Sequence, residues 1–291
     1  MAKPGRLGVG VIGAGKVGAV LGAALRAAEH AVVGVHAVSE ESRERAEALL
    51  PGVPVLEIPE IVRRSELVLL AVPDDALGPL VQGLADAGHW QQGQIVVHTA
   101  GRYGTGILDP ARAAGAIPLA IHPAMSFTGM SLDLTRLQEC MFGVTADRMM
   151  LPIAQALVVE MGAESTVIEE ADRARYHAAL AHASNHLVTI AGQAAQLLAS
   201  VGVDRPDRVL GPLMRASLEN ALASGEGALT GPVARGDVGT VLVHRAALEH
   251  DAVTVDVREA YRALSRATAQ RALARGLLTE AQAAAILDAL A

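Results

Sequence analysis

Six residues near the N-terminus form the pattern Gly-x-Gly-x-x-Gly: Gly13-Ala14-Gly15-Lys16-Val17-Gly18. The pattern follows an apolar run and opens an amphipathic helical pattern, which is the context that a dinucleotide-binding loop requires. In such a loop the first glycine permits a tight turn, the second admits a pyrophosphate, and the third lets helix and strand pack closely. The helix N-terminus adds unpaired N–H groups and a partial positive charge. We expect all six residues to bind a nicotinamide dinucleotide; the alternative is a strand–helix turn without a ligand.

The segment that would contact the adenosine ribose comes after the next apolar run. An NAD site usually has Asp or Glu there, about 20 residues beyond the loop. This sequence instead has Val35-His36-Ala37-Val38-Ser39, and its first acidic residue is Glu40. Ser39, helped by Arg43, could bind a 2′-phosphate, which favours NADP without excluding NAD. Ser39 could equally be only the N-cap of the following helix.

Residues that follow other expected strands can also contact a ligand. Ligands of doubly wound sheets lie beyond the carboxyl ends of the strands, so Val72 and Pro73 should line the dinucleotide. Thr99 and Ser126 follow the ends of two later strands. We expect Thr99 to contact the cofactor and Ser126 to contact the substrate.

Two histidines and two aspartates occupy the same strand ends. His98 and His122 could each act as a catalytic acid, or could serve only as structural side chains. Asp74 and Asp75 come directly before a helical pattern. A capping role is therefore expected for them rather than a catalytic carboxylate pair.

One stretch of the second half, residues 176–203, contains no Asp, Glu, Lys or Arg. Its polar residues recur at spacings of three and four and so share one helix face; they are His182, Asn185, His186, Thr189, Gln193 and Gln196. Reduction of a carbonyl needs a proton donor as the hydride arrives, and a histidine such as His182 suits that role at neutral pH. Asn185, one turn later, would bind the same oxygen or orient the substrate. The alternative is a buried polar network that holds a dimer together.

A loop rich in glycine and proline interrupts the helices of the second half, with the sequence Ala228-Leu229-Thr230-Gly231-Pro232-Val233-Ala234-Arg235-Gly236-Asp237. Arg235 could hold a substrate carboxylate or a cofactor phosphate, or could form a salt bridge across an interface. Asp237 is expected to cap the next helix. Thr279 and Gln282 have the spacing of a capping box at the start of the last helix.

The elements that position these residues change character along the chain. The first half alternates short apolar runs with helical patterns, which is typical of a parallel sheet covered by helices. The expected strands are 7–12, 31–35, 54–56, 67–72, 95–98, 118–121, 140–145 and 165–168, with helices near 17–29, 41–50, 59–64, 76–87, 107–114 and 151–161. Only helices are expected afterwards, at 171–200, 208–224, 238–250, 255–274 and 280–289.

The predicted fold class is therefore an α/β Rossmann fold, with a doubly wound and mainly parallel sheet, followed by an all-α C-terminal domain. We expect the dinucleotide-binding domain to span residues 1–168 and the helical substrate and dimerisation domain to span residues 169–291. At 291 residues the chain is long for a single core, which also favours two domains.

Composition excludes several classes of partner. The net charge of −7 and the lack of a basic run argue against nucleic-acid binding. The many polar groups in residues 176–203 argue against a membrane span, and no signal peptide is expected because the glycine loop follows the N-terminus directly. The single cysteine, Cys140, cannot form an internal disulfide, which favours a reducing compartment such as the cytoplasm. No metal site is expected.

The sequence resembles the two-domain Rossmann-like proteins whose C-terminal part is the domain of unknown function 2520, often described as NADP-dependent oxidoreductases. The resemblance spans nearly the whole chain, and its residues are 13–18, 71–75, 122–127, 176–179, 183–185 and 229–237. More distantly, residues 181–186 are similar to a helix of β-hydroxyacid dehydrogenases. That family has a catalytic Lys where His182 stands and an Asn where Asn185 stands. Histidine in place of Lys is one departure, and Val38, where Arg would bind a 2′-phosphate, is another.

These observations predict an NAD(P)-dependent oxidoreductase that uses NADPH to reduce a small 2-oxo or 3-oxo acid. Hydride transfer is expected in the interdomain cleft of a homodimer that associates through the helical domain. The resemblance makes ketopantoate reduction a candidate for the substrate. Two alternatives stay open: a non-catalytic dinucleotide-binding sensor or assembly protein, and an imine reductase in the manner of pyrroline carboxylate reductase.

Overall fold

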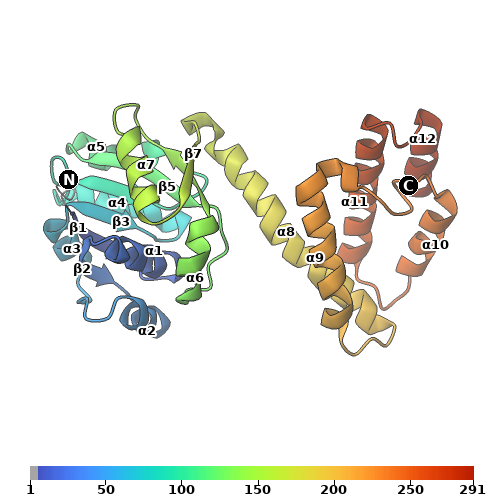
Figure 1. The fold of residues 1–291 in the computed structure, drawn as a ribbon, viewed down its shortest axis with the longest axis horizontal. Helices are drawn as coiled ribbons and strands as arrows, with labels where there is room; N and C mark the ends of the chain where they lie inside the picture. The colour runs from blue at the N-terminus through green and yellow to red at the C-terminus, as the bar shows by residue number, and fades with distance from the viewer. Residues whose placement is uncertain (1–5) are drawn as a thin grey trace. The chain divides into compact units, whose positions relative to one another are not determined.

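The computed structural model describes residues 6–291. The chain divides into two units, Met1–Ser184 and Asn185–Ala291 (Figure 1). The division lies inside helix α8 (Arg173–Ser200), whereas the last strand, β7 (Glu164–Val167), ends just before the boundary expected between residues 168 and 169. One continuous helix thus belongs to both units, and each unit is described by itself.

The first unit is built on one seven-stranded sheet with the order β2-β1-β3-β4-β5-β6-β7. Besides β7, its strands are β1 (Gly8–Ile12), β2 (Ala31–His36), β3 (Leu67–Leu70), β4 (Ile95–His98), β5 (Ile117–Pro123) and β6 (Met141–Thr145). The first five strands pair in parallel, β6 is antiparallel to β5, and β7 is parallel to β6. Strand order reverses at β1, between β2 and β3, so the predicted doubly wound, mainly parallel sheet is confirmed.

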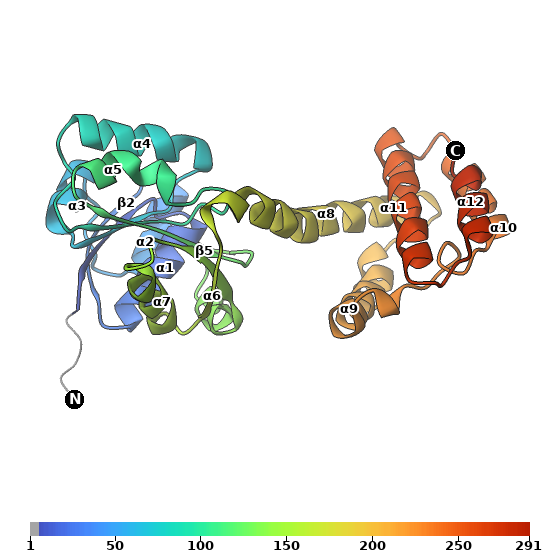
Figure 2. The same ribbon diagram turned by 90° about the horizontal axis from the view of Figure 1, so that it is seen from above.

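Helices cover both faces of this sheet (Figure 2). They are α1 (Lys16–Ala27), α2 (Glu40–Leu49), α3 (Ile58–Arg64), α4 (Asp74–Asp86), α5 (Asp109–Ala113), α6 (Leu132–Arg136) and α7 (Leu151–Glu160). In β3, Leu67 and Leu69 pack into a core with α1 and α7, and Val68 and Leu70 pack into a second core with α3 and α4. A strand that is buried on both faces must be apolar at every position, which explains the uninterrupted apolar runs of the sequence.

Three details of the first unit differ from the sequence prediction. Residues 54–56 form no strand: Val55 makes one isolated parallel bridge with Val35, because Pro54 has no N–H to donate to a ladder. The helix expected at 107–114 is split into a 3₁₀ turn, Thr105–Leu108, and the short α5, which has a proline in its first turn. Helix α6 was not expected, since its five residues are too few to show a helical period.

The second unit contains helices only. After α8 come α9 (Pro206–Ser224), α10 (Val238–Leu248), α11 (Val255–Ala274) and α12 (Glu280–Ala289). Val241, Ala269, Ile286 and Leu290 form the main buried cluster, so the small core lies between α10, α11 and α12. The capping predictions for this unit are confirmed: Asp237 accepts a hydrogen bond from the Thr240 N–H, and Thr279 forms a capping box with Gln282.

The uncharged stretch at residues 176–203 lies almost wholly in α8. Across residues 6–291, no helix has the length and the apolar character that crossing a membrane requires.

Candidate functional site

The glycine loop joins β1 to α1, and the structure gives a different reason for a glycine at each of the three positions. Gly13 has φ +99°, and a Cβ there would lie 2.5 Å from the carbonyl oxygen of Ala71. A Cβ at Gly18 would overlap the carbonyl oxygen of Gly13. A Cβ at Gly15 would meet no atom within 4 Å. Gly13 and Gly18 therefore serve the fold, whereas Gly15 leaves an open space beside the backbone.

The N-terminus of α1 faces that open space. The N–H groups of Gly13 and Ala14 donate to the carbonyl oxygen of His36 at 3.2 and 3.0 Å, which ties the loop to the end of β2. Helix α1 begins at Lys16, and its N-cap Gly15 provides no side-chain cap. The first N–H groups of a helix have no acceptor inside the helix and carry a partial positive charge. This arrangement fits a pyrophosphate, which would accept from these N–H groups and pair with the Lys16 ammonium.

An open groove of about 470 Å³ runs along the carboxyl ends of the strands from this loop. Its lining residues are Gly15, Lys16, Val17, Ala71, Val72, Pro73, Asp74, Thr99, Ala100, Gly101, His122 and His177. Gly15, Lys16, Val17, Val72, Pro73 and Thr99 were expected from the sequence to bind the cofactor, and the fold brings them to one groove. Two of the lining side chains, His122 and His177, come from β5 and α8.

The ribose end of the expected site lies at the start of α2. Ser39 is the N-cap of this helix and accepts a hydrogen bond from the Ser42 N–H at 3.2 Å. The Arg43 Nε donates to the carbonyl oxygen of Ala37 at 3.5 Å, so its guanidinium lies beside the end of β2. Ser39 therefore caps α2, and its contact with a 2′-phosphate stays a prediction.

The two aspartates at the start of α4 do not form the expected caps. Asp74 and Asp75 lie within the first turn of α4, whose N-cap is Pro73 and has no side-chain hydrogen bond. Asp74 forms an ion pair with Arg102, with 3.0 Å between Oδ2 and Nε. The Asp74 carboxylate thus ties α4 to the loop after β4 at the edge of the groove.

His98 is a structural residue. Its side chain is fully buried, its Nδ1 lies 3.2 Å from the Ala100 N–H, and its Nε2 lies 2.8 Å from the Gly104 carbonyl oxygen. Because Nδ1 must accept from Ala100, Nε2 carries the proton and donates to Gly104. Burial lowers the pKa of His98 to about 4, so its ring is neutral and holds the turn after β4 in place.

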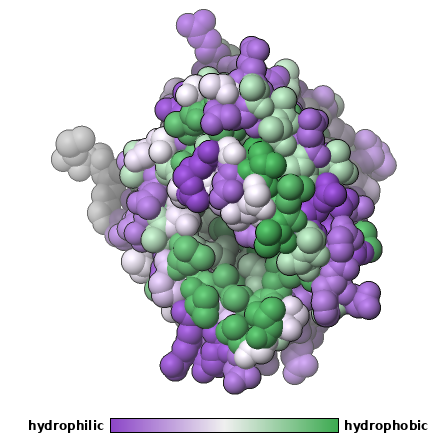
Figure 3. Space-filling model, turned by 90° about the vertical axis from the view of Figure 1, so that its right-hand side faces the viewer, coloured by the Kyte–Doolittle hydropathy of each residue, from purple (hydrophilic) through white to green (hydrophobic). Residues whose placement is uncertain are grey.

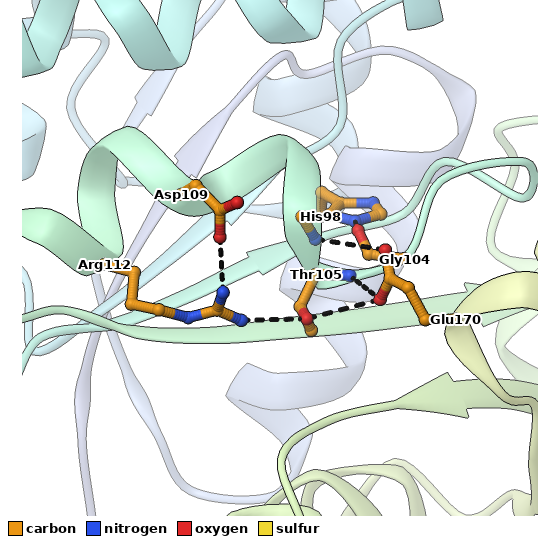
Figure 4. A network of polar contacts seen from close by, with 7 residues as sticks. His98, Gly104, Thr105, Asp109, Arg112 and Glu170 are labelled. Atoms are coloured by element: carbon orange, nitrogen blue, oxygen red, sulfur yellow. Dashed lines mark hydrogen bonds and ion pairs between the residues drawn. The ribbon is translucent and has the colours of Figure 1, made fainter.

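Glu170 holds the same turn from the segment that precedes α8 (Figure 4). Its carboxylate accepts hydrogen bonds from the N–H groups of Thr105 and Gly106 at 2.7 and 3.2 Å. Arg112 donates to the Thr105 hydroxyl at 3.0 Å and also pairs with Asp109. The carboxylate therefore caps the 3₁₀ turn from 65 residues away and fixes the loop that contributes Thr99, Ala100 and Gly101 to the groove.

His122, Tyr176 and His177 form a cluster at the other end of the groove. The Tyr176 hydroxyl lies 3.0 Å from the His122 Nδ1, and the centroids of the two imidazole rings are 6.0 Å apart. Burial, followed by the nearby His177, Arg173 and His98, lowers the pKa of His122 to about 4. His122 is therefore a neutral side chain near pH 7, within a groove that also holds the Lys16 cation.

Arg173, the first residue of α8, supports this cluster through hydrogen bonds to β5 and β6. It is 1% exposed; its Nε donates to the Thr145 hydroxyl at 2.7 Å, and its Nη2 donates to the carbonyl oxygens of Ala120 and Gly143 at 2.8 and 3.1 Å. Burial lowers the pKa of its guanidinium to about 10, so it remains a cation at neutral pH. Its central carbon lies 5.9 Å from the centroid of the Tyr176 ring. Arg173 thereby anchors the first turn of α8 to β5 and β6.

Two family models match the sequence in succession. The Rossmann-like domain matches residues 1–123, and the domain of unknown function DUF2520 matches residues 140–268. The chain thus has a Rossmann-like domain followed by a DUF2520 domain. No protein of curated function matches the sequence.

Three solved structures show how far the fold of this DUF2520 protein extends. Protein TM1727 from Thermotoga maritima is 25% identical, with 92% of this chain and 99% of that chain covered and a TM-score of 0.66. BF3122 from Bacteroides fragilis, a candidate NADP oxidoreductase, is 22% identical over 90% and 98% of the two chains, with a TM-score of 0.75. Pyrroline carboxylate reductase from Plasmodium falciparum, with NADP bound, is 12% identical over 99% and 100%, with a TM-score of 0.59. The two-part fold is thus shared over almost the whole chain.

The substrate residues expected from the sequence of the DUF2520 protein are divided between the two units. Ser126 follows β5, and its hydroxyl lies 3.4 Å from the hydroxyl of Ser184. His182 is an exposed residue of α8, five positions beyond His177. Asn185 and Arg235 belong to the second unit. The roles of these four residues stay predictions.

The sequence by itself indicates no catalytic role for His177. A histidine at the start of a helix carries no local signal of the strand against which that helix packs. Within residues 6–291, no group of three or more His, Cys, Asp or Glu side chains is arranged to hold a metal ion.

Asp133 fixes the loop between β5 and α6 of the DUF2520 protein. Its side chain is fully buried and accepts hydrogen bonds from the N–H groups of Thr128 and Gly129 at 2.7 and 2.8 Å. Burial alone would raise the pKa of this carboxyl, but these bonds and those from the Thr128 hydroxyl and Arg136 outweigh it, so the pKa lies below its usual value. A Cβ at Gly129 would meet Lys16 and Arg45, so this loop lies against the start of α1.

We expect Asp133→Asn to destabilise the first unit by about 2 kcal/mol at pH 7, because an amide cannot accept from all of these donors. A carboxyl whose pKa is lower in the folded than in the unfolded protein stabilises above its unfolded pKa of about 3.9, and this contribution is lost as the pH falls through the folded pKa. The difference between wild type and variant should therefore shrink below about pH 4.

Urea unfolding followed by the fluorescence of Trp90 measures this effect, since Trp90 is the single tryptophan and is buried in the first unit. Asp147→Asn, at an exposed carboxylate, is the matched control. An equal destabilisation at pH 7 and pH 3 would contradict the expected link between the ionisation of Asp133 and the stability of the first unit.

Proposed function

We propose that the protein is an oxidoreductase that uses a nicotinamide dinucleotide, with NADP preferred, to reduce a small substrate. The observation that carries the proposal is the open backbone at Gly15 beside the N-terminus of α1, at one end of a groove along the strand ends. Bound there, the reduced dinucleotide would supply a hydride. Lys16 and the first N–H groups of α1 would hold the pyrophosphate, while Val72, Pro73 and Thr99 would line the rest. Ser39 and Arg43 would contact a 2′-phosphate.

The proposed substrate is a small 2-oxo or 3-oxo acid, with ketopantoate as one candidate. In the assignment from the sequence, His182 donates the proton, and Asn185, Ser126 and Arg235 position the substrate. A second candidate is a cyclic imine, and the fold shared with the Plasmodium pyrroline carboxylate reductase favours it. Both substrates need the same hydride and one proton, so the cofactor assignment does not depend on the choice. We assign the protein to the cytoplasm, where its free thiol, Cys140, would stay reduced.

The proposed activity is tested by NADPH oxidation with a panel of oxo acids, including ketopantoate, and cyclic imines, including pyrroline carboxylate. We expect turnover with at least one substrate and a higher kcat/KM with NADPH than with NADH. Thermal shifts with each dinucleotide are measured in parallel, because ligand binding raises the stability of the native state by mass action. A thermal shift without any turnover would favour a non-catalytic sensor or assembly protein. If the dinucleotides produced no thermal shift and no substrate were turned over, both functions would be ruled out.

We also propose that the protein is a homodimer joined through its helical unit. Helix α9 has no buried residue among its 19, although it carries the exposed apolar side chains Val209, Leu213, Leu218 and Leu222. On α8, Val188 is 72% exposed. Hydrophobic residues also gather on the face of this unit that is turned to the viewer in Figure 3. Apolar helix faces of this extent are unstable in water unless another surface covers them, and a second copy supplies a matching apolar face.

The dimer is tested by analytical ultracentrifugation at micromolar concentrations. We expect wild type to sediment as a dimer and Leu222→Glu to weaken association about 100-fold or more, because a charge in an apolar interface loses its hydration without gaining a partner. Met149→Glu, at an equally exposed apolar residue of the first unit, should leave the dimer unchanged. A wild-type monomer, or dimers of equal strength in both variants, would contradict the proposal.

A further inference from the structure

We propose that His177 delivers the proton to the substrate and that His122, a neutral imidazole, donates a hydrogen bond to the same substrate atom. This inference rests on the proposed function and replaces the role that the family resemblance gives to His182. It is carried by the position of the two rings in the groove and by the glycines that make room for them.

The two histidines lie at the end of the groove where a nicotinamide would be placed. The lining runs from Gly15 after β1, past Val72 after β3 and Thr99 after β4, to His122 at the end of β5. A pyrophosphate held at Gly15 directs the adenosine half of a dinucleotide towards β2. The other half must then extend over β3 and β4. The nicotinamide ring would reach Thr99 and Gly101, opposite His122 and His177.

Two glycines create the space for this cluster. A Cβ at Gly101 would lie 2.5 Å from the Cδ2 of His177 and 2.9 Å from the Nε2 of His122. A Cβ at Gly143 would lie 2.7 Å from the hydroxyl oxygen of Tyr176. Neither glycine has a positive φ, so the backbone conformation does not require glycine at these positions. The volume of the aromatic cluster requires glycine there, because a Cβ would overlap its side chains. Both imidazole rings consequently approach the groove wall at Gly101.

Tyr176 fixes which nitrogen of His122 carries the proton. The Tyr176 hydroxyl lies 3.0 Å from the His122 Nδ1, and in this proposal the hydroxyl is the donor of that hydrogen bond. With the hydroxyl as donor, the proton of the neutral ring resides on Nε2, the His122 atom nearest to a Cβ at Gly101. Burial and the adjacent His177, Arg173 and His98 all disfavour a charge on His122. His122 thus keeps its proton and acts as a hydrogen-bond donor, with Tyr176 as its positioning residue.

The step balances with the reduced dinucleotide as the hydride source. A bound dinucleotide would supply the hydride to the carbon of the C=O or C=N bond, and the π electron pair of that bond would move to oxygen or nitrogen. This atom takes the proton from the His177 imidazolium, whose N–H bond breaks and leaves its electrons on a neutral ring. His122 stabilises the negative charge that develops on the same atom without transferring its proton. Water then returns a proton to His177 after the product leaves.

The placement is tested without turnover by NMR of the imidazole Cε1–H resonances, assigned with single variants. We expect NADP⁺ to shift the resonances of His122 and His177, while an ADP-ribose 2′-phosphate, which lacks nicotinamide, shifts them much less. His89, a half-buried residue after α4 that does not line the groove, is the internal control. Tyr176→Phe should change the ¹⁵N signature of the His122 tautomer while dinucleotide binding persists. If NADP⁺ raises the melting temperature but neither resonance moves, the inference is overturned while the cofactor proposal stands.

The role is tested by His177→Ala with the substrate that gives the highest turnover. We expect kcat to fall about 100-fold or more, the usual effect of losing a general acid, with an unchanged thermal shift by NADPH. Added imidazole should restore part of the rate, which no structural role of His177 would produce. His89→Gln should match wild type. A complete loss of turnover in His182→Gln, together with normal turnover in His177→Ala, would identify His182 as the proton donor and overturn the inference.

Discussion

Gly15→Ala should weaken NADPH binding at least 10-fold, equivalent to about 1.4 kcal/mol, while the protein unfolds at nearly the same temperature. The added Cβ meets no protein atom within 4 Å, and the backbone of Gly15, at φ −71° and ψ −168°, suits any residue. The methyl group therefore costs the fold little, but it occupies the space into which a pyrophosphate must come to reach the N–H groups of α1. Isothermal titration calorimetry and thermal unfolding measure the two effects separately.

Gly18→Ala is the matched comparison three residues further along the same loop. There the Cβ would overlap the carbonyl oxygen of Gly13 and lie 2.8 Å from the Cβ of Ala71. Neither of these atoms can move away freely, because one belongs to the backbone and the other is attached directly to it. We therefore expect a loss of about 3 kcal/mol in the free energy of unfolding. Equal dinucleotide affinity in Gly15→Ala and wild type would show that no phosphate binds at this loop.

Arg173→Met should destabilise the first unit by about 3 kcal/mol. Methionine fills a similar volume, but it leaves the carbonyl oxygens of Ala120 and Gly143 and the hydroxyl of Thr145 without their buried donor. Urea unfolding followed by Trp90 fluorescence reports on this unit alone, because Trp90 is buried beside β4.

Arg175→Met is the control for that substitution. Arg175 lies two residues further along the same helix, its side chain is 85% exposed, and it pairs only at the surface with Asp172. We expect a change within about 0.5 kcal/mol. Similar losses in both variants would mean that the helix, and not the buried hydrogen bonds, accounts for the effect. In Arg173→Met, the first turn of α8 should also loosen, and the NMR signals of Tyr176 and His177 should broaden.

The order of strands and helices was readable from the sequence because it depends on local periodicity. Strands such as Leu67–Leu70 are apolar at every position, and this pattern distinguishes a strand covered on both faces from an amphipathic helix. The errors fall where periodicity is too short to measure, as in residues 54–56 and in α6. The caps at Ser39, Asp237 and Thr279 were also predictable, since a capping side chain bonds to the backbone only three residues away.

Only one end of the groove could be predicted from the sequence. Its phosphate end consists of consecutive residues, and the spacing of their glycines is typical of a dinucleotide-binding loop. The structure explains the glycine at each of the three positions separately. Its other end depends on contacts across the fold. His98 and His122 looked equivalent in the sequence, yet His98 is held by the backbone of Gly104 whereas His122 lines the groove. Only the three-dimensional environment separates a structural imidazole from one that can meet a substrate.

By itself, the sequence determined the dinucleotide loop, the change from α/β to all-helical structure, and the helix caps, because each follows from residues within one or two turns of one another. The tertiary structure decided that His122 meets Tyr176, 54 residues away, and that His177 joins them beside Gly101. The physical reason is that no local pattern records which strand a helix packs against. That partner is chosen by buried groups such as Arg173, whose hydrogen bonds reach across β5 and β6.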